Sequence, residues 1–122
     1  DAIFSVHRAM GPGFSESIYE SCLIEEFEIR GIECKSQVQL PVIYKGKVLH
    51  KYFKLDLLVE NEIIVELKVV SEILPIHKAQ LFSYMKLSDK RIGYVANFNV
   101  ALMKNGIKRL RLDDASEFGA RF

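Results

Sequence analysis

Apolar positions near the N-terminus of the chain recur at the spacing of a helix. Ile3, Val6 and Met10 lie three and four residues apart, and a glycine-proline-glycine run then interrupts the pattern. Ser15 is a typical N-cap residue, and the segment that follows predicts a second helix to about Arg30, before a glycine that suits a helix end. The sequence therefore predicts two helices at the start of the fold.

The second predicted helix is amphipathic. At about 100° per residue, serines and glutamates gather on one side, while Glu16, Leu23 and Phe27 line up on the other. This pattern predicts that Glu16 begins a stripe that faces the core.

Three extended segments follow, over residues 33–44, 48–59 and 62–70. Their connections, 45–47 and 60–62, are short and polar, and short connections join antiparallel strands. The pattern therefore predicts two consecutive antiparallel hairpins.

Helical and extended patterns alternate in the last part of the chain. Pro75 suits the first turn of a third helix that runs to about Leu87, and the mostly apolar residues 91–97 predict a buried strand. A helix between two strands allows them to be parallel neighbours. Residues 100–112 predict a short helix or loop and then a last strand at 107–112. The predicted class is α/β, with a mixed central sheet flanked by helices.

Composition agrees with one globular domain over residues 1–122, because 49% of the side chains are hydrophobic and the length suits a single core. Seventeen basic and sixteen acidic side chains give a net charge of +1, so no overall charge marks a nucleic-acid-binding protein. Any basic surface must be local, and each candidate group is also compatible with an ordinary solvated face. The two groups are Lys45, Lys47, Lys51 and Lys54, and Lys104, Lys108, Arg109 and Arg111.

Cysteine content and hydropathy bear on the compartment. Cys22 and Cys34 are the two cysteines, with no CxxC pair and no secretory segment, so we expect reduced thiols and a cytoplasmic protein. No apolar run is long enough to cross a bilayer, so no membrane role is expected.

The segment DLLVENEIIVELK, residues 56–68, places charges among apolar strand residues. Side chains alternate along a strand, so Glu66 and Lys68 share one face. If the hairpin is symmetric about Asn61, Asp56 lies directly opposite Glu66 on that face. Two opposed carboxylates repel each other, so a positive charge must compensate them.

Two kinds of compensation remain open. A divalent cation between Asp56 and Glu66 would neutralise both, and carboxylates without histidine or cysteine favour Mg²⁺ or Mn²⁺ over zinc. The alternative is a half-buried salt bridge from Lys68 to either acid that holds two strands together.

Residues of two helices could join this group. Glu16 is predicted to face the sheet, where an unpaired carboxylate would be costly. Gln80 and Tyr84 lie four residues apart on one face of the third helix. Taken singly, Gln80 could be a surface amide and Tyr84 a core aromatic residue.

The sequence resembles a known family in several motifs. Gly13, Glu16 and Tyr19 match the signature of the GxxExxY proteins, which are grouped in the PD-(D/E)XK nuclease superfamily. The resemblance covers nearly the whole chain, and its other matching segments are VHRAMGPG, YKGK, LDLLV, IIVELK, HKAQLFSYMKL, NFNV and NGIKR. It implies a restriction endonuclease-like core of order αβββαβ, with one extra N-terminal helix.

The resemblance also implies roles for the candidate residues. Asp56 and Glu66 would be metal ligands, together with the Leu67 carbonyl and Glu16, and Lys68 would be the catalytic lysine. Gln80 would support the site and, with Lys68 and Tyr84, contact the nucleic acid; Gln80 and Tyr84 resemble the Q-x-x-x-Y motif of RecB-like nucleases. One departure is that Leu55 stands where the superfamily's name has proline.

The expected function is a metal-dependent nuclease of DNA or RNA that uses Mg²⁺ or Mn²⁺. Two other classes stay open: a catalytically silent module that binds nucleic acid or a protein partner, and a structural domain in which the charges form a satisfied polar network. A homodimer or a larger complex is a further expectation, because so small a domain has few elements left for sequence recognition.

Overall fold

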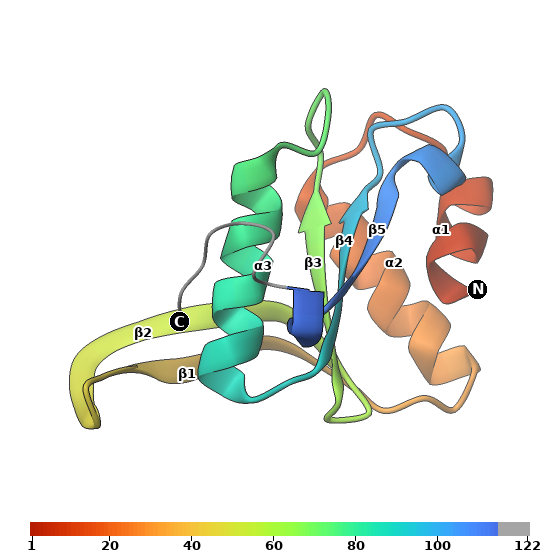
Figure 1. Cartoon of the computed structure of the whole chain (residues 1–122). Coiled ribbons are helices and arrows are strands. Elements are labelled where there is room, and N and C mark those ends of the chain that lie inside the picture. The colour runs from red at the N-terminus through yellow and green to blue at the C-terminus, as the bar shows by residue number, and fades with distance from the viewer. Residues whose placement is uncertain (115–122) are drawn as a thin grey trace.

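The computed structural model describes residues 1–114 and consists of a five-stranded mixed sheet with helices on both faces (Figure 1). The strand order is β1-β2-β3-β4-β5, the same as the order in the sequence. This confirms the predicted fold class, while residues 115–122 of the predicted domain lie outside the described part. The elements are α1 Ala2–Met10, α2 Glu16–Ile29, β1 Cys34–Tyr44, β2 Lys47–Val59, β3 Ile63–Lys68, α3 Pro75–Ser88, β4 Ile92–Asn97, the 3₁₀ helix η1 Met103–Asn105 and β5 Ile107–Arg111.

Strand pairing follows the predicted register. β2 and β3 are antiparallel, with Leu57 opposite Val65 and Val59 opposite Ile63, which is symmetric about Asn61. β3 and β4, which the α3 crossover connects, are parallel. β4 and β5 are again antiparallel, so the last predicted strand is also present. The short predicted helix or loop before it is η1.

Two apolar cores lie on opposite faces of the sheet. α1 and α2 pack on one face, where Tyr19 and Leu23 are fully buried against sheet residues such as Leu67. α3 packs on the other face through Leu81 and neighbouring residues. Each strand of the centre therefore carries apolar side chains on both faces, as expected for a sheet covered by helices on both sides.

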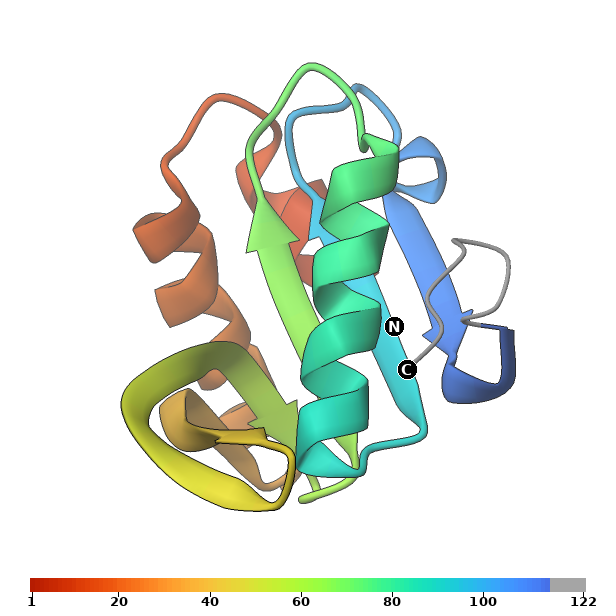
Figure 2. The ribbon, with the colours of Figure 1, turned by 60° about the vertical axis from the view of Figure 1, so that its left-hand side comes forward.

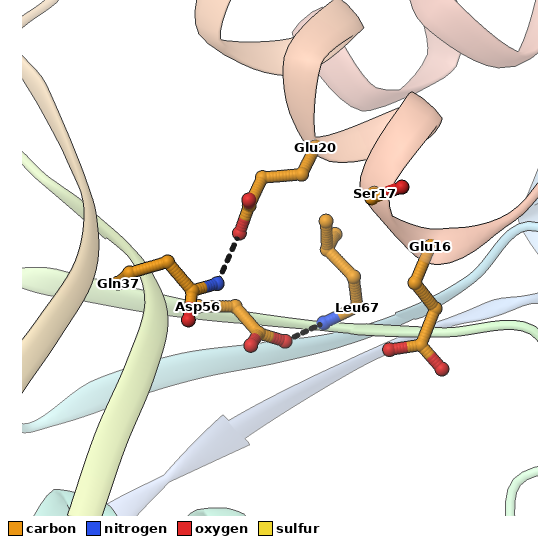
Figure 3. A pocket seen from close by; sticks show the side chains of 6 residues that line it. All are labelled: Glu16, Ser17, Glu20, Gln37, Asp56 and Leu67. Carbon is orange, nitrogen blue, oxygen red and sulfur yellow. Dashed lines mark hydrogen bonds between the residues drawn. The ribbon is translucent and has the colours of Figure 1, made fainter.

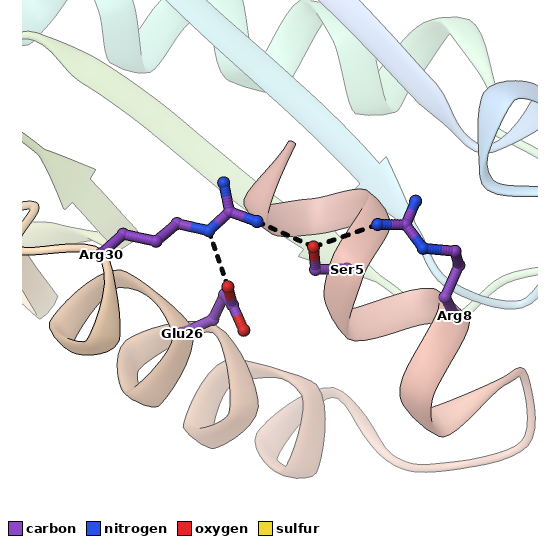
Figure 4. Close-up of polar contacts among 4 residues, drawn as sticks. All are labelled: Ser5, Arg8, Glu26 and Arg30. Carbon is purple, nitrogen blue, oxygen red and sulfur yellow. Dashed lines mark hydrogen bonds and ion pairs between the residues drawn. The ribbon is translucent and has the colours of Figure 1, made fainter.

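Polar contacts link α1 to α2 on their solvent-exposed side (Figure 4). Arg30 donates from Nε to the Glu26 carboxylate at 2.6 Å and from its guanidinium to the Ser5 hydroxyl at 2.8 Å. Arg8 donates to the same hydroxyl at 3.2 Å. These bonds fix the C-terminal end of α2 against α1 from the solvent side.

β1 and β2 form a two-stranded ribbon that projects beyond the rest of the sheet (Figures 1 and 2). β2 has 13 residues. Its pairing with β3 is confined to the segment 57–59 at its C-terminal end. The base of the ribbon packs on α3, where the rings of Phe53 and Tyr84 stack at 5.0 Å between centroids. The ribbon comprises residues 34–55.

One prediction for α2 is wrong. The buried stripe of this helix is Tyr19, Leu23 and Phe27, and Glu16 is exposed rather than facing the core. The reason is position along the helix: Glu16 is the first residue of α2, in a turn that lies at the end of the apolar contact with the sheet. The third strand also ends at Lys68 rather than Val70. Within residues 1–114, no helix is both long enough and apolar enough to span a membrane.

Candidate functional site

The site begins where β2 separates from β3. The ladder between these strands reaches Leu57 and Val65. One residue further, Asp56 uses its side chain instead: Oδ2 accepts the Leu67 N–H at 2.8 Å. The Asp56 N–H donates to Glu66 Oε1 at 3.3 Å. Carboxylates thus occupy positions that a regular ladder would give to backbone carbonyls, and both acids meet at the opening between the strands.

Glu66 is the buried member of this pair, with 4% of its surface exposed. The pKa of Glu66 is raised to about 9, mainly by burial and in addition by the negative charge and the hydrogen-bonded side chain of Asp56. The Asp56 N–H and the positive charge of Lys68 act in the opposite direction, but more weakly. Two carboxylates so close favour a shared proton or a bound cation over two negative charges.

α3 supplies the neighbours of Lys68. The Lys68 ammonium donates to Gln80 Oε1 at 3.3 Å, so β3 and α3 meet through a charged hydrogen bond. Tyr84 lies one turn further along the helix. Burial raises its pKa, and the negative charges of Glu66 and Asp56 raise it further, which places its phenol within the field of the acid pair.

Glu16 lines a pocket of about 220 Å³ together with Asp56 and Leu67 (Figure 3). The helix α2 brings Glu16 and Glu20 to one side of this pocket, and β2 brings Asp56 to the other. Gln37 of β1 donates to Glu20 at 2.6 Å and closes the rim. The structure therefore brings the four predicted residues Asp56, Glu66, Lys68 and Gln80 together directly and leaves Glu16 at the pocket's edge.

The donor set suits a hard cation in number and chemistry. Within the described residues, no three His, Cys, Asp or Glu side chains are close enough together to hold one metal ion, so Glu16 does not complete a three-acid cluster. Mg²⁺ commonly binds through one or two carboxylates and keeps several waters, so Asp56 and Glu66 suffice as protein side chains. In an extended strand the N–H and C=O of one residue point to the same edge. Because the Leu67 N–H points to Asp56, its carbonyl faces the same opening.

The sequence did not predict three features of the site. Asn97 at the end of β4 is 1% exposed and holds the backbone of Val70, accepting its N–H at 3.1 Å and donating to its carbonyl at 2.9 Å. Gln37 has a φ of 51° at the ribbon base, opposite Asp56. An asparagine at the end of a buried strand could have indicated the role of Asn97. Nothing in the sequence indicates that the backbone of Gln37 is left-handed.

The third feature is the structural role of the signature tyrosine. The Tyr19 hydroxyl donates to the Gly11 carbonyl and accepts the Phe14 N–H at 3.2 Å, while its ring stacks on Phe98 at 4.3 Å between centroids. Gly13 has a φ of 109°, a conformation that side chains disfavour. Tyrosine and glycine therefore fix the loop that sets the start of α2, and with it Glu16.

A family model of the PD-(D/E)XK nuclease superfamily matches residues 1–110. The chain belongs to this superfamily. Nucleases of the superfamily generally use divalent metal ions, which agrees with the oxygen donors of the site. The narrower resemblance to the GxxExxY proteins stays a prediction.

A solved structure has the same fold as this PD-(D/E)XK chain. The crystal structure of SSO0001 aligns with a TM-score of 0.61 at 17% sequence identity, over 85% of this chain and 55% of that one. The likeness concerns the fold alone, and the chain spans about half the length of that protein. No curated protein matches the chain.

Proposed function

We propose that this chain is a metal-dependent nuclease that hydrolyses phosphodiester bonds in DNA or RNA. The observation that carries the proposal is the meeting of Asp56, Glu66 and Lys68 at the opening between β2 and β3. Membership in the PD-(D/E)XK superfamily supports the nuclease class. In this proposal Asp56, Glu66 and the Leu67 carbonyl hold Mg²⁺ or Mn²⁺, with Glu16 beside them. A bound ion would polarise the phosphate and lower the pKa of a water molecule.

Lys68 is assigned the stabilisation of negative charge. Its ammonium lies beside the acid pair and is oriented by Gln80, so it can donate to a phosphate oxygen as charge develops there. This interaction strengthens in the transition state and therefore acts on the rate more than on binding. Gln80 accepts a hydrogen bond from the ammonium and so fixes its direction. Tyr84, whose pKa is raised by burial and by the charges of Glu66 and Asp56, can contact the substrate.

The test is an activity screen on single- and double-stranded DNA and RNA with Mg²⁺ or Mn²⁺. The variant Lys68→Ala is expected to lose cleavage by about a hundredfold or more, the usual cost of removing one such donor. The exposed Lys104→Ala provides the matched control and should cleave like the unaltered protein. Full activity of Lys68→Ala would contradict the assigned role.

A second candidate is a module of the same fold that binds nucleic acid or a protein partner without cleavage. It is favoured by one observation: within residues 1–114, Glu16 does not join the other acids in a cluster of three. This candidate predicts that the unaltered protein and Lys68→Ala give the same result in the screen, with no cleavage by either. Cleavage by the unaltered protein that Lys68→Ala loses would exclude it.

A further inference from the structure

The ribbon concentrates positive charge in a chain that is nearly neutral. Residues 34–55 contain five lysines and no acidic residue. Of the chain's seventeen lysines and arginines, twelve therefore remain elsewhere, against all sixteen acidic residues. The ribbon is a basic arm on an otherwise acidic molecule, and such a local patch attracts polyanions even where the net charge is small.

The two faces of the ribbon differ in what they contact. On β2, Phe53 and Leu55 are buried and belong to the core under α3. The alternate residues from Val48 to Lys54, on the opposite face, are exposed. They include Val48, which is 60% exposed, and Tyr52, which is 64% exposed, and the row also contains His50 and Lys54. Lys54 is the lysine of this row, since Lys47 and Lys51 alternate with it along the strand, and the row is not needed for packing.

This exposed row leads directly into the candidate site. Lys54 and Asp56 are alternate residues of one strand, about 6.5 Å apart at twice the rise per residue. Tyr52 is one further step away. Across the ribbon, Gln39 is opposite Lys54 and Pro41 is opposite Tyr52, so the neighbouring strand adds no acidic side chain. A polymer lying along the row would reach Asp56 after it passes Tyr52 and Lys54.

The edge of the ribbon is poorly suited to a second copy of this chain. Pro41 removes one backbone donor from β1, and the pairing register shifts between Pro41 and Ile43. Two copies would also bring the lysines of one ribbon against those of the other. These features oppose the addition of a strand, whereas a negatively charged partner meets no such obstacle.

We propose that the exposed face of the ribbon binds single-stranded nucleic acid and guides it to Asp56. On this face the ammonium group of Lys54 pairs with a phosphate, and the ring of Tyr52 offers a platform on which an unpaired base stacks. The other lysines of the ribbon add to its positive potential. The bases of a duplex are already stacked on one another, so an exposed ring on the ribbon has no equivalent partner there. This inference rests on the proposed nuclease function because it names the substrate of the same site.

The test measures binding apart from cleavage. Fluorescence anisotropy of labelled single-stranded and duplex oligonucleotides in EDTA reports affinity without hydrolysis. The double variant Tyr52→Ala/Lys54→Gln is expected to bind the single strand about tenfold or more weakly, given the usual worth of one stacked base. The control Ile29→Ala/Lys104→Gln removes an exposed apolar side chain and one charge away from the ribbon, and should bind normally.

Each outcome has one meaning. Weaker single-strand binding by the ribbon variant alone, with an unchanged melting temperature, supports the inference. Equal affinity of both variants, or tighter binding of the duplex than of the single strand, overturns it, and so does a ribbon variant that changes only the oligomeric state. If the unaltered protein binds the single strand through the ribbon but cleaves nothing with Mg²⁺ or Mn²⁺, the proposed nuclease function fails while the ribbon's role stands.

Discussion

Glu66 shows how one buried side chain sets the electrostatics of the candidate site. Its carboxyl lies beside that of Asp56 with 4% of its surface exposed, and Lys68 compensates only part of the charge. Without a bound cation, the protonation state of lowest free energy for the two carboxyl groups keeps a proton on Glu66. The feature that suits metal binding therefore also makes the metal-free protein sensitive to pH.

The first prediction concerns this sensitivity in the absence of divalent ions. The pKa of Glu66 is about 9 in the folded protein and 4.5 as the ordinary value, so between these values the folded state keeps a proton that the unfolded chain has released. The free energy of unfolding should then fall as the pH rises from about 5 to about 9. Glu66→Gln should remove most of this slope and stabilise the protein at pH 8 by about 1 to 3 kcal/mol.

Urea denaturation in EDTA at several pH values measures the effect. Glu62→Gln changes an exposed acid in the turn of the same hairpin and should keep the slope of the unaltered protein. An unchanged slope in Glu66→Gln would contradict the raised pKa.

At the scale of elements, hydrogen bonds beyond the end of β3 hold the chain against the C-terminal end of β4. β3 ends at Lys68, and the Lys68 carbonyl accepts the N–H of Phe98 at 3.0 Å. Beyond Lys68, the side-chain amide of Asn97 replaces the backbone pairing of a strand. It accepts the N–H of Val70 and donates to the Val70 carbonyl. The chain that leaves the candidate site is thereby fixed to β4.

We expect Asn97→Ala to destabilise the fold by about 2 kcal/mol, because it leaves the N–H of Val70 without its partner in a partly buried place. Thermal unfolding followed by circular dichroism measures the loss. Asn99→Ala is the matched control: its amide bonds to the Val70 carbonyl at 3.3 Å from an exposed position, so it should cost much less. Equal losses in the two variants would show that Asn97 has no special role.

At the scale of the whole molecule, the site joins parts that lie far apart in the sequence. α2 contributes the pocket wall with Glu16, opposite Asp56 of β2 (Figure 3). β3 contributes Glu66 and Lys68, and α3 contributes Gln80. A ligand that bridges such parts binds the native state and not the unfolded chain. Binding should therefore appear as a change in global stability.

We accordingly expect Mn²⁺ and Mg²⁺ to raise the melting temperature of the protein. A concentration one hundred times the dissociation constant stabilises by about 2.7 kcal/mol. Asp56→Asn should abolish the shift, whereas Glu25→Gln, an exposed residue on α2, should retain it. A shift of equal size in Asp56→Asn would mean that the ions bind elsewhere.

The sequence by itself determined the elements, the class of fold and the register of the β2–β3 hairpin. Apolar periods of two and of about 3.6 residues distinguish strands from helices, and a short polar turn about Asn61 fixes the register that pairs Leu57 with Val65. These properties depend on neighbours in the chain. Local patterns are sufficient to predict them.

Only the tertiary structure decided how the strands and helices part around the site. The separation of β2 from β3 at Asp56, the left-handed backbone of Gln37 and the exposed position of Glu16 depend on how the ribbon packs on α3 and how far α2 extends past the sheet. The same holds for Asn97, whose partner Val70 lies 27 residues earlier. Contacts of this kind form between surfaces that the chain brings together only on folding. The local pattern of apolar and polar residues therefore does not predict them.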